Sequence, residues 1–137
     1  MDIKEKAAGY HDRGFNCAQS VLCACGEYTG LDEKSALAAA GGFGGGVRCG
    51  EICGSITSAV MALGLANPYN TEGDTEAKDK IAQLTKRCIK RFQDEFGCIR
   101  CAELKRSGHR CDELITFAAG LAEDMILNEK GEQNGNL

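Results

Sequence analysis

The chain has 137 residues, 43% of them apolar, and a formal net charge of −4. This length suits one domain with a buried core, and an acidic balance without a basic stripe argues against nucleic-acid binding. No apolar run reaches the length that spans a bilayer, and the charged residues 1–6 lack the apolar segment of a signal peptide. We therefore expect a cytoplasmic protein without membrane insertion.

Apolar residues recur every three or four positions through most of the chain, which predicts amphipathic helices. Asn16 and Asp32 can cap helix starts, and Gly30 and Gly97 can end helices. The expected helices cover residues 3–13, 17–28, 35–40, 53–65, 75–96, 102–106 and 111–128. We predict an all-α, single-domain bundle of about six or seven helices over residues 1–130, followed by a flexible polar tail at 131–137.

A glycine-rich segment lies in the middle of the chain, where six of residues 41–50 are glycine. Such a backbone can adopt positive φ and approach another segment closely, which favours a bent hinge loop. The segment lacks the Gly-Lys-Ser/Thr ending of a phosphate-binding loop, and no strand is expected before it. Cys49 and Cys53 stand at its end, so we interpret it as the hinge of a thiol site.

Nine cysteines are many for a chain expected in the cytoplasm, where metal ligation or thiol redox chemistry is favoured over a disulfide framework. Free amides and the helix dipole favour a thiolate at a helix start. The cysteines at or near expected helix starts are Cys17, Cys53, Cys101 and Cys111. Cys88 lies within an apolar stripe, and we interpret it as a packing residue. We interpret Cys23 and Cys25 as packing or surface thiols rather than as members of a site.

Two short cysteine pairs are weak metal signals on their own. Cys98 and Cys101 form a C-x-x-C pair without the strand-to-helix context of a thioredoxin, and Cys49 and Cys53 are spaced one residue wider. The roles of Cys49 and Cys98 stay open.

The order and spacing of several motifs resemble the C-GCAxxG-C-C family of proposed redox-active proteins. The resemblance extends over residues 4–127 and is carried by residues 15–22, 42–46, 53–65, 101–104 and 111. It implies that the four family cysteines are Cys17, Cys53, Cys101 and Cys111. Ser55 and Ser58 stand where the motif has alanine and glycine; both are small, so we expect the packing to be retained.

Three functions follow from these residues. The leading hypothesis is a thiol redox protein, either a thiol–disulfide oxidoreductase or an electron carrier, that serves an unidentified redox partner protein. In this hypothesis Cys53 is the attacking thiol, and Cys17, Cys101 or Cys111 resolves the disulfide that it forms. The second is a zinc or iron–sulfur protein that uses the same four thiolates. The third is a structural helical module whose cysteines only pack. The substrate, the cofactor and a homodimer stay open.

A shared site requires the fold to gather cysteines that are more than ninety positions apart. The glycine hinge can turn the chain back so that the helix after Cys53 begins beside Cys17. The turn at 107–108 can place Cys101 near Cys111. We therefore expect at least two of the four within disulfide or metal-sharing reach, with Cys53 among them.

Overall fold

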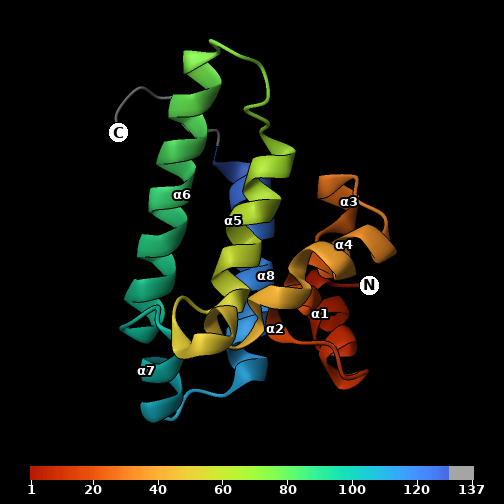
Figure 1. Cartoon of the computed structure of the whole chain (residues 1–137), viewed down its shortest axis with the longest axis vertical. Coiled ribbons are helices and arrows are strands. Elements are labelled where there is room, and N and C mark those ends of the chain that lie inside the picture. The colour runs from red at the N-terminus through yellow and green to blue at the C-terminus, as the bar shows by residue number, and fades with distance from the viewer. Residues whose placement is uncertain (130–137) are drawn as a thin grey trace.

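A computed structural model describes residues 1–129, so the polar tail predicted at 131–137 lies outside the described residues. Over that range the chain forms eight α-helices, six of them with seven or more residues, which confirms the all-α, single-domain prediction. They are α1 (Ile3–Asp12), α2 (Cys17–Ala24), α3 (Gly26–Thr29), α4 (Glu33–Ala40), α5 (Gly54–Ala66), α6 (Thr75–Phe96), α7 (Cys101–Arg106) and α8 (Cys111–Asn128) (Figure 1). No helix within residues 1–129 is both long enough and apolar enough to cross a bilayer.

Side-chain caps begin several helices where the sequence predicted them. Asn16 Oδ1 accepts a hydrogen bond from the Gln19 N–H at 2.9 Å, and Gln19 Oε1 accepts one from the Asn16 N–H at 3.0 Å. This reciprocal pair satisfies two amides that the first turn of α2 leaves free. Asp32 caps α4 in the same way, through the Ser35 N–H at 3.1 Å.

The helix predicted at 17–28 is interrupted at Cys25 and becomes α2 and α3. The Cys25 N–H is shared between the carbonyls of Val21 and Leu22, both at 3.2 Å, and ψ of Cys25 rises to 10°. Gly26, a poor helix former, follows directly, so the chain changes direction at little cost. Gly30 then ends α3 with φ of 77°.

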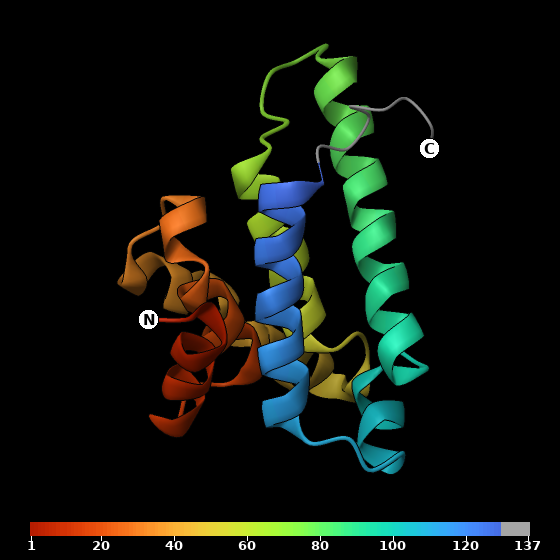
Figure 2. The same cartoon turned by 180° about the vertical axis from the view of Figure 1, so that it is seen from behind.

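The three long helices α5, α6 and α8 stand side by side, with α1 to α4 grouped on one flank (Figures 1 and 2). α6 returns the chain from the far end of α5 to the end where α5 begins (Figure 2). As a consequence α5, α7 and α8 all start at one end of the molecule. Helix α6 and the glycine-rich hinge together allow helices that are distant in the sequence to start close to one another.

α8 is the central helix and packs against α1, α2, α5 and α6. The interior is built from side chains with no exposed surface, among them Val21, Leu22, Ile56, Leu63, Leu84, Phe92, Ile115 and Met125. Ion pairs from Arg91 to Asp124, at 2.9 Å, and to Glu129 join α6 to α8 on the outside.

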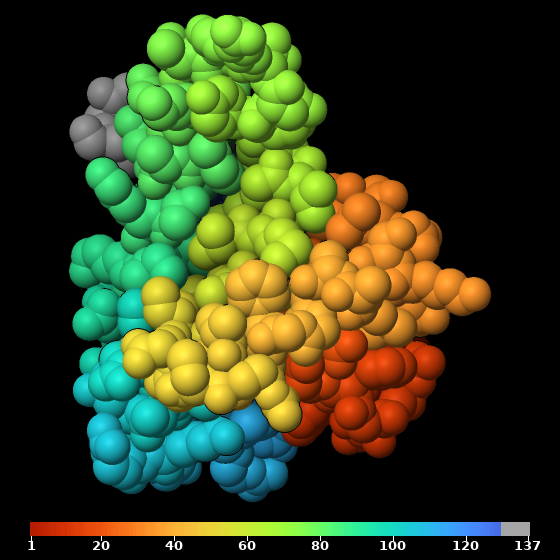
Figure 3. Space-filling model, viewed as in Figure 1, coloured from red at the N-terminus to blue at the C-terminus, as the bar shows by residue number. Residues whose placement is uncertain are grey.

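The glycine-rich segment forms a turn of left-handed backbone rather than a simple loop. Gly45 and Gly46 have φ of 66° and 64°, and the next two residues, Val47 and Arg48, follow at 56° and 62°. For residues with a Cβ this conformation costs about 1–2 kcal/mol each. The segment lies on the surface between α1 and α7, as the yellow region of Figure 3 shows.

Candidate functional site: a cavity between four helix starts

The structure brings the four cysteines together at the end where the helices begin. Cys17, Cys101 and Cys111 are the first residues of α2, α7 and α8, and Cys53 is the residue that precedes α5. All four line one cavity of about 30 Å³, together with Gly45, Ser55, Lys105 and Leu114. Four helix starts, each with free amides, therefore surround one small space.

Backbone pairing holds the segment before α5 against the segment before α7. The Cys53 N–H donates to the Ile99 carbonyl at 2.8 Å, and the Cys101 N–H donates to the Glu51 carbonyl at 2.6 Å. These two bonds flank an isolated antiparallel bridge between Ile52 and Arg100. The pairing places the starts of two helices beside each other, although 48 positions separate Cys53 from Cys101 in the sequence.

Two glycines are needed because side chains would collide where these segments meet. A Cβ on Gly54 would lie 2.8 Å from Cys17 Sγ and 2.7 Å from the carbonyl oxygen of Phe43. A Cβ on Gly46 would lie 2.4 Å from the carbonyl oxygen of Glu51 and 2.9 Å from the Cβ of Cys101. The glycines thus allow α5 and the left-handed turn to approach the sulfurs.

Cys17 carries the activated sulfur of the site. A hydrogen bond from the Cys53 thiol is the largest cause that lowers its pKa, from 9.0 to about 6. The backbone N–H groups of Gly45 and Ala18 and the Ser55 hydroxyl lower it further, while burial acts in the opposite direction. Cys17 is therefore mostly a thiolate at neutral pH, held by donors from three segments of the chain.

The pKa of Cys53, which the sequence predicts as the attacking thiol, shifts in the opposite direction. Its pKa is raised, because its thiol donates to the Cys17 sulfur and because it is only 3% exposed. It precedes the first turn of α5, and its side chain is turned into the core rather than left open at the helix start. The thiolate is therefore favoured at Cys17 and the protonated thiol at Cys53.

Cys101 and Cys111 form the outer side of the cavity, and both are half-buried. Burial raises the pKa of Cys111, the charges of Cys17 and Cys101 raise it further, and Lys105 opposes them. Lys105 is itself exposed, so a cation stands where the cavity meets solvent.

Ser55 is a member of the site that sequence reasoning missed, having been treated only as a small packing residue. It is fully buried, and its Oγ has no hydrogen-bond partner of good geometry among the described residues. The hydroxyl nevertheless lies close enough to the sulfurs of Cys17 and Cys53 to lower the pKa of both. The signal present in the sequence is a hydroxyl two residues after Cys53.

The remaining cysteines lie elsewhere. Cys25 and Cys88 have no exposed surface, and burial raises the pKa of each to about 12, in agreement with a packing role. Cys49 is exposed, with its Sγ 3.5 Å from the Gly46 carbonyl oxygen, and Cys98 is half-buried against the core. Each of the nine thiols is free in this structure.

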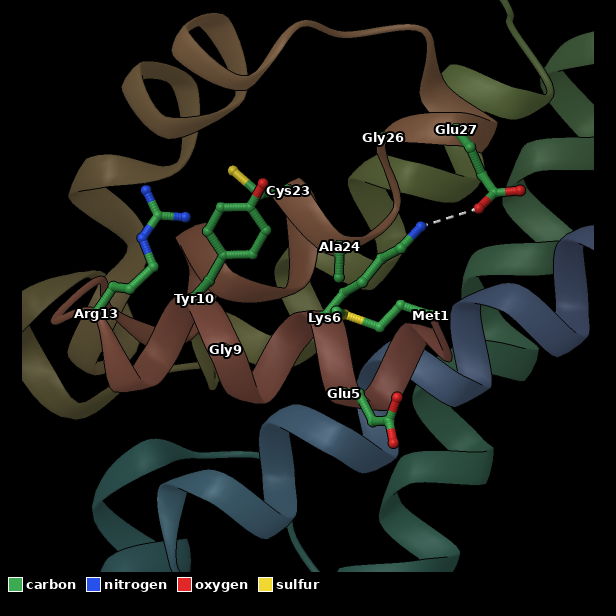
Figure 4. A pocket seen from close by; sticks show the side chains of 10 residues that line it. All are labelled: Met1, Glu5, Lys6, Gly9, Tyr10, Arg13, Cys23, Ala24, Gly26 and Glu27. Atoms are coloured by element: carbon green, nitrogen blue, oxygen red, sulfur yellow. Dashed lines mark hydrogen bonds and ion pairs between the residues drawn. The ribbon is translucent and has the colours of Figure 1, made fainter.

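A larger pocket of about 600 Å³ opens between α1, α2 and α3, and none of the four cysteines lines it (Figure 4). Its thiol is Cys23, whose pKa burial raises to about 11. Tyr10 beside it donates a hydrogen bond to Glu33 at 2.7 Å, and this bond raises the pKa of Tyr10 to about 12. The pocket therefore offers space but no activated group.

The alternative of a metal centre can be compared with the same geometry. Within residues 1–129, no three His, Cys, Asp or Glu side chains are arranged as a group that could hold one metal ion. The cysteines line a common cavity, but they are not placed around it as ligands of a single ion.

One of three comparisons with known proteins finds a family for this chain. The model of the C_GCAxxG_C_C family, described as "Putative redox-active protein", matches residues 15–125, a range that includes all four cysteines. No curated protein and no solved structure matches the chain. The match covers most of the chain, and the protein belongs to the C_GCAxxG_C_C family.

Proposed function

We propose that this protein is a dithiol redox protein in which Cys17 attacks and Cys53 resolves. The observation that carries the proposal is the hydrogen bond from the Cys53 thiol to a Cys17 sulfur whose pKa lies near 6. A thiolate at neutral pH with a second thiol in contact is the arrangement that forms and releases a mixed disulfide.

The exchange step balances with a partner disulfide as the oxidant. The Cys17 thiolate attacks one sulfur of that disulfide, an S–S bond forms between them, and the other partner sulfur leaves as a thiolate. Cys53 gives its proton to a departing thiolate and attacks Cys17, which releases the second partner sulfur. The protein then holds a Cys17–Cys53 disulfide, and the partner has gained two electrons.

Cys101 and Cys111 extend the pair toward the surface. Both line the same cavity, and both are more exposed than Cys53. In the proposal one of them attacks the Cys17–Cys53 disulfide. The new disulfide then includes an outer cysteine, where an external dithiol can reduce it. This route gives the two outer cysteines a role that packing alone does not require.

Disulfide mapping tests the proposal. The reduced protein is oxidised with a small disulfide reagent, its remaining thiols are blocked, and the linked peptides are identified by mass spectrometry. We expect Cys17–Cys53 as the first linkage, formed reversibly, and links to Cys101 or Cys111 only later. A first linkage that omits Cys17, or the absence of any linkage within the four cysteines, would contradict it.

Metal analysis of anaerobically purified protein separates this function from the zinc or iron–sulfur alternative. Substoichiometric metal in protein with four reactive thiols agrees with the dithiol function. One metal ion or cluster per chain, lost when Cys17 and Cys111 are replaced by serine, would instead favour the metal-binding alternative.

A further inference from the structure

The small cavity beside Cys17 contains a buried hydroxyl, that of Ser55. Ser55 Oγ is fully buried, lines the cavity and has no hydrogen-bond partner of good geometry among residues 1–129. Leaving a hydroxyl buried without a partner costs about 1–3 kcal/mol. By contrast, the buried hydroxyl of Ser58, one turn further along α5, donates to the Ala18 carbonyl at 2.7 Å. Ser55 Oγ lies beside the sulfurs of Cys17 and Cys53 and lowers the pKa of both, and its remaining hydrogen-bonding capacity can serve a molecule in the cavity.

The dimensions of the cavity restrict what it can hold. Its volume of about 30 Å³ is close to the share of one molecule in liquid water, roughly 30 Å³. A molecule of one or two heavy atoms fits inside it, whereas a larger disulfide reaches the half-buried Cys17 only from outside the cavity. Around it stand the Ser55 hydroxyl and the backbone of Gly45, with Lys105 at the solvent side. Most of the lining is apolar, so the occupant is small and forms only a few hydrogen bonds, with Ser55 as the polar side chain inside the cavity.

We propose that this cavity binds hydrogen peroxide, that Cys17 is the sulfur it oxidises, and that Ser55 Oγ is the hydrogen-bond partner that holds it. The proposal rests on the proposed dithiol function, because it names the small oxidant that converts Cys17 and Cys53 to a disulfide.

The reaction balances in two steps. The Cys17 thiolate attacks one peroxide oxygen, an S–O bond forms and the O–O bond breaks. Cys17 becomes a sulfenic acid, and the other oxygen leaves as hydroxide, which takes the proton of the Cys53 thiol and becomes water. The Cys53 thiolate then attacks the Cys17 sulfur, an S–S bond forms, and the sulfenic oxygen leaves as hydroxide. An external dithiol reduces the disulfide and completes the cycle.

The position of Cys53 fits both steps. Its thiol already donates to the Cys17 sulfur, so its proton lies beside the hydroxide that leaves. Once deprotonated, it is in contact with the sulfur that it must attack. Fast capture by Cys53 also protects the sulfenic acid from a second peroxide molecule, which would produce an irreversible sulfinic acid.

The test compares the rate of peroxide reaction in reduced wild-type, Ser55→Ala and Ser58→Ala proteins. The rate of Cys17 oxidation by hydrogen peroxide is divided by the rate of its alkylation by iodoacetamide, which removes any change in the thiolate fraction. We expect Ser55→Ala to lower this ratio about tenfold, as the loss of one hydrogen bond in the transition state does. Ser58→Ala, which removes a buried hydroxyl outside the cavity, should keep the wild-type ratio.

Ser55→Ala removes one oxygen atom and keeps the Cβ, so we expect this variant to fold. A wild-type ratio in Ser55→Ala, or an equal loss in Ser58→Ala, would overturn the proposal.

A second measurement uses the size of the oxidant. Cumene hydroperoxide carries the same O–O bond on a bulky group, and we expect it to oxidise Cys17 at least tenfold more slowly than hydrogen peroxide. In Cys53→Ser, mass spectrometry should find one added oxygen atom on Cys17. Equal rates for the two peroxides would contradict the role of the cavity. If a disulfide reagent still links Cys17 to Cys53 in that case, the dithiol function stands and only the peroxide proposal fails.

Discussion

Cys17 and Cys88 are both surrounded mainly by protein, yet the pKa of Cys17 is lowered and the pKa of Cys88 is raised. Cys88 lies in the middle of α6 with no exposed surface, and burial raises its pKa to about 12. Cys17 is half-buried at the start of α2, and its pKa falls to about 6. Burial disfavours the thiolate at both positions, so the difference comes from hydrogen-bond donors that reach Cys17 and not Cys88.

The same contrast separates the two ends of the molecule. The helix bodies supply apolar stripes, in which a cysteine behaves as a small hydrophobic residue. The helix starts supply free amides, and the fold places four of them around one cavity. A cysteine in this protein is therefore reactive according to its position along a helix and to the donors that meet it there.

The largest expected effect is the difference in alkylation rate between these two thiols. At pH 7 their thiolate fractions differ by about five orders of magnitude, and the lower nucleophilicity of the more acidic thiol offsets between two and three of these. We expect iodoacetamide to label Cys17 about a hundredfold faster than Cys88 in the reduced protein, as measured by mass spectrometry of each peptide. Equal rates, or Cys53 as the fastest thiol, would contradict the comparison.

A second effect concerns the close approach of α5 to the sulfur of Cys17. Gly54→Ala places a Cβ 2.8 Å from Cys17 Sγ, so a neighbour must shift. We expect the free energy of unfolding to fall by about 1–3 kcal/mol in urea denaturation. Gly64→Ala is the matched control, since Gly64 lies in the same helix with no atom within 4 Å of the added Cβ.

In the control the better helix propensity of alanine should raise stability by up to about 1 kcal/mol. Opposite signs in the two variants support a contact at the helix start. Destabilisation of similar size in both would mean that α5 tolerates no added methyl anywhere, and the special role of Gly54 would be lost.

A third effect is the pH dependence of Cys17. Alkylation should increase as pH rises through about 6, where the thiolate forms, and should level off above pH 7. Cys53→Ala removes the main donor to this thiolate, so the midpoint should move up toward the ordinary 9.0. At pH 7 we expect alkylation of Cys17 to slow several-fold.

Cys25→Ala is the control for the third effect, because it also truncates a fully buried thiol but leaves the cavity intact. It should keep the midpoint near 6. A midpoint that rises equally in both variants would show that general loosening of the core, and not the donated hydrogen bond, determines the pKa.

Much of this architecture follows from local sequence signals. Asn16 and Asp32 cap helices where predicted, and helix-start placement selected the four cysteines that now line one cavity. The signals are local because capping and apolar periodicity act within one or two turns.

Other features depend on contacts between distant segments. The break at Cys25 and the left-handed residues Val47 and Arg48 have no local signal of their own. The directions of the pKa shifts at Cys17 and Cys53 have no local signal either, because both residues lie near helix starts. They depend on which sulfur receives the donors from Gly45 and Ala18, and only the tertiary structure decides this.

The smallest expected effect concerns the strain of the left-handed turn. Arg48 has φ of 62° and therefore carries a steric cost that glycine does not. Arg48→Gly should raise the free energy of unfolding by about 0.5–1 kcal/mol, after the greater freedom of glycine in the unfolded chain is subtracted from the relieved strain. Arg48→Ala is the control: it removes the same charge but keeps the Cβ, so it should give no gain. An equal gain in both variants would assign the effect to the charge of Arg48 and leave the turn unstrained.

The same variant also tests whether the turn positions a donor. If Arg48→Gly stabilises the chain but shifts the midpoint of Cys17 alkylation to higher pH, then the rigid turn holds the Gly45 N–H against the thiolate. In that case the contrast between helix starts and helix bodies extends to the backbone that joins them.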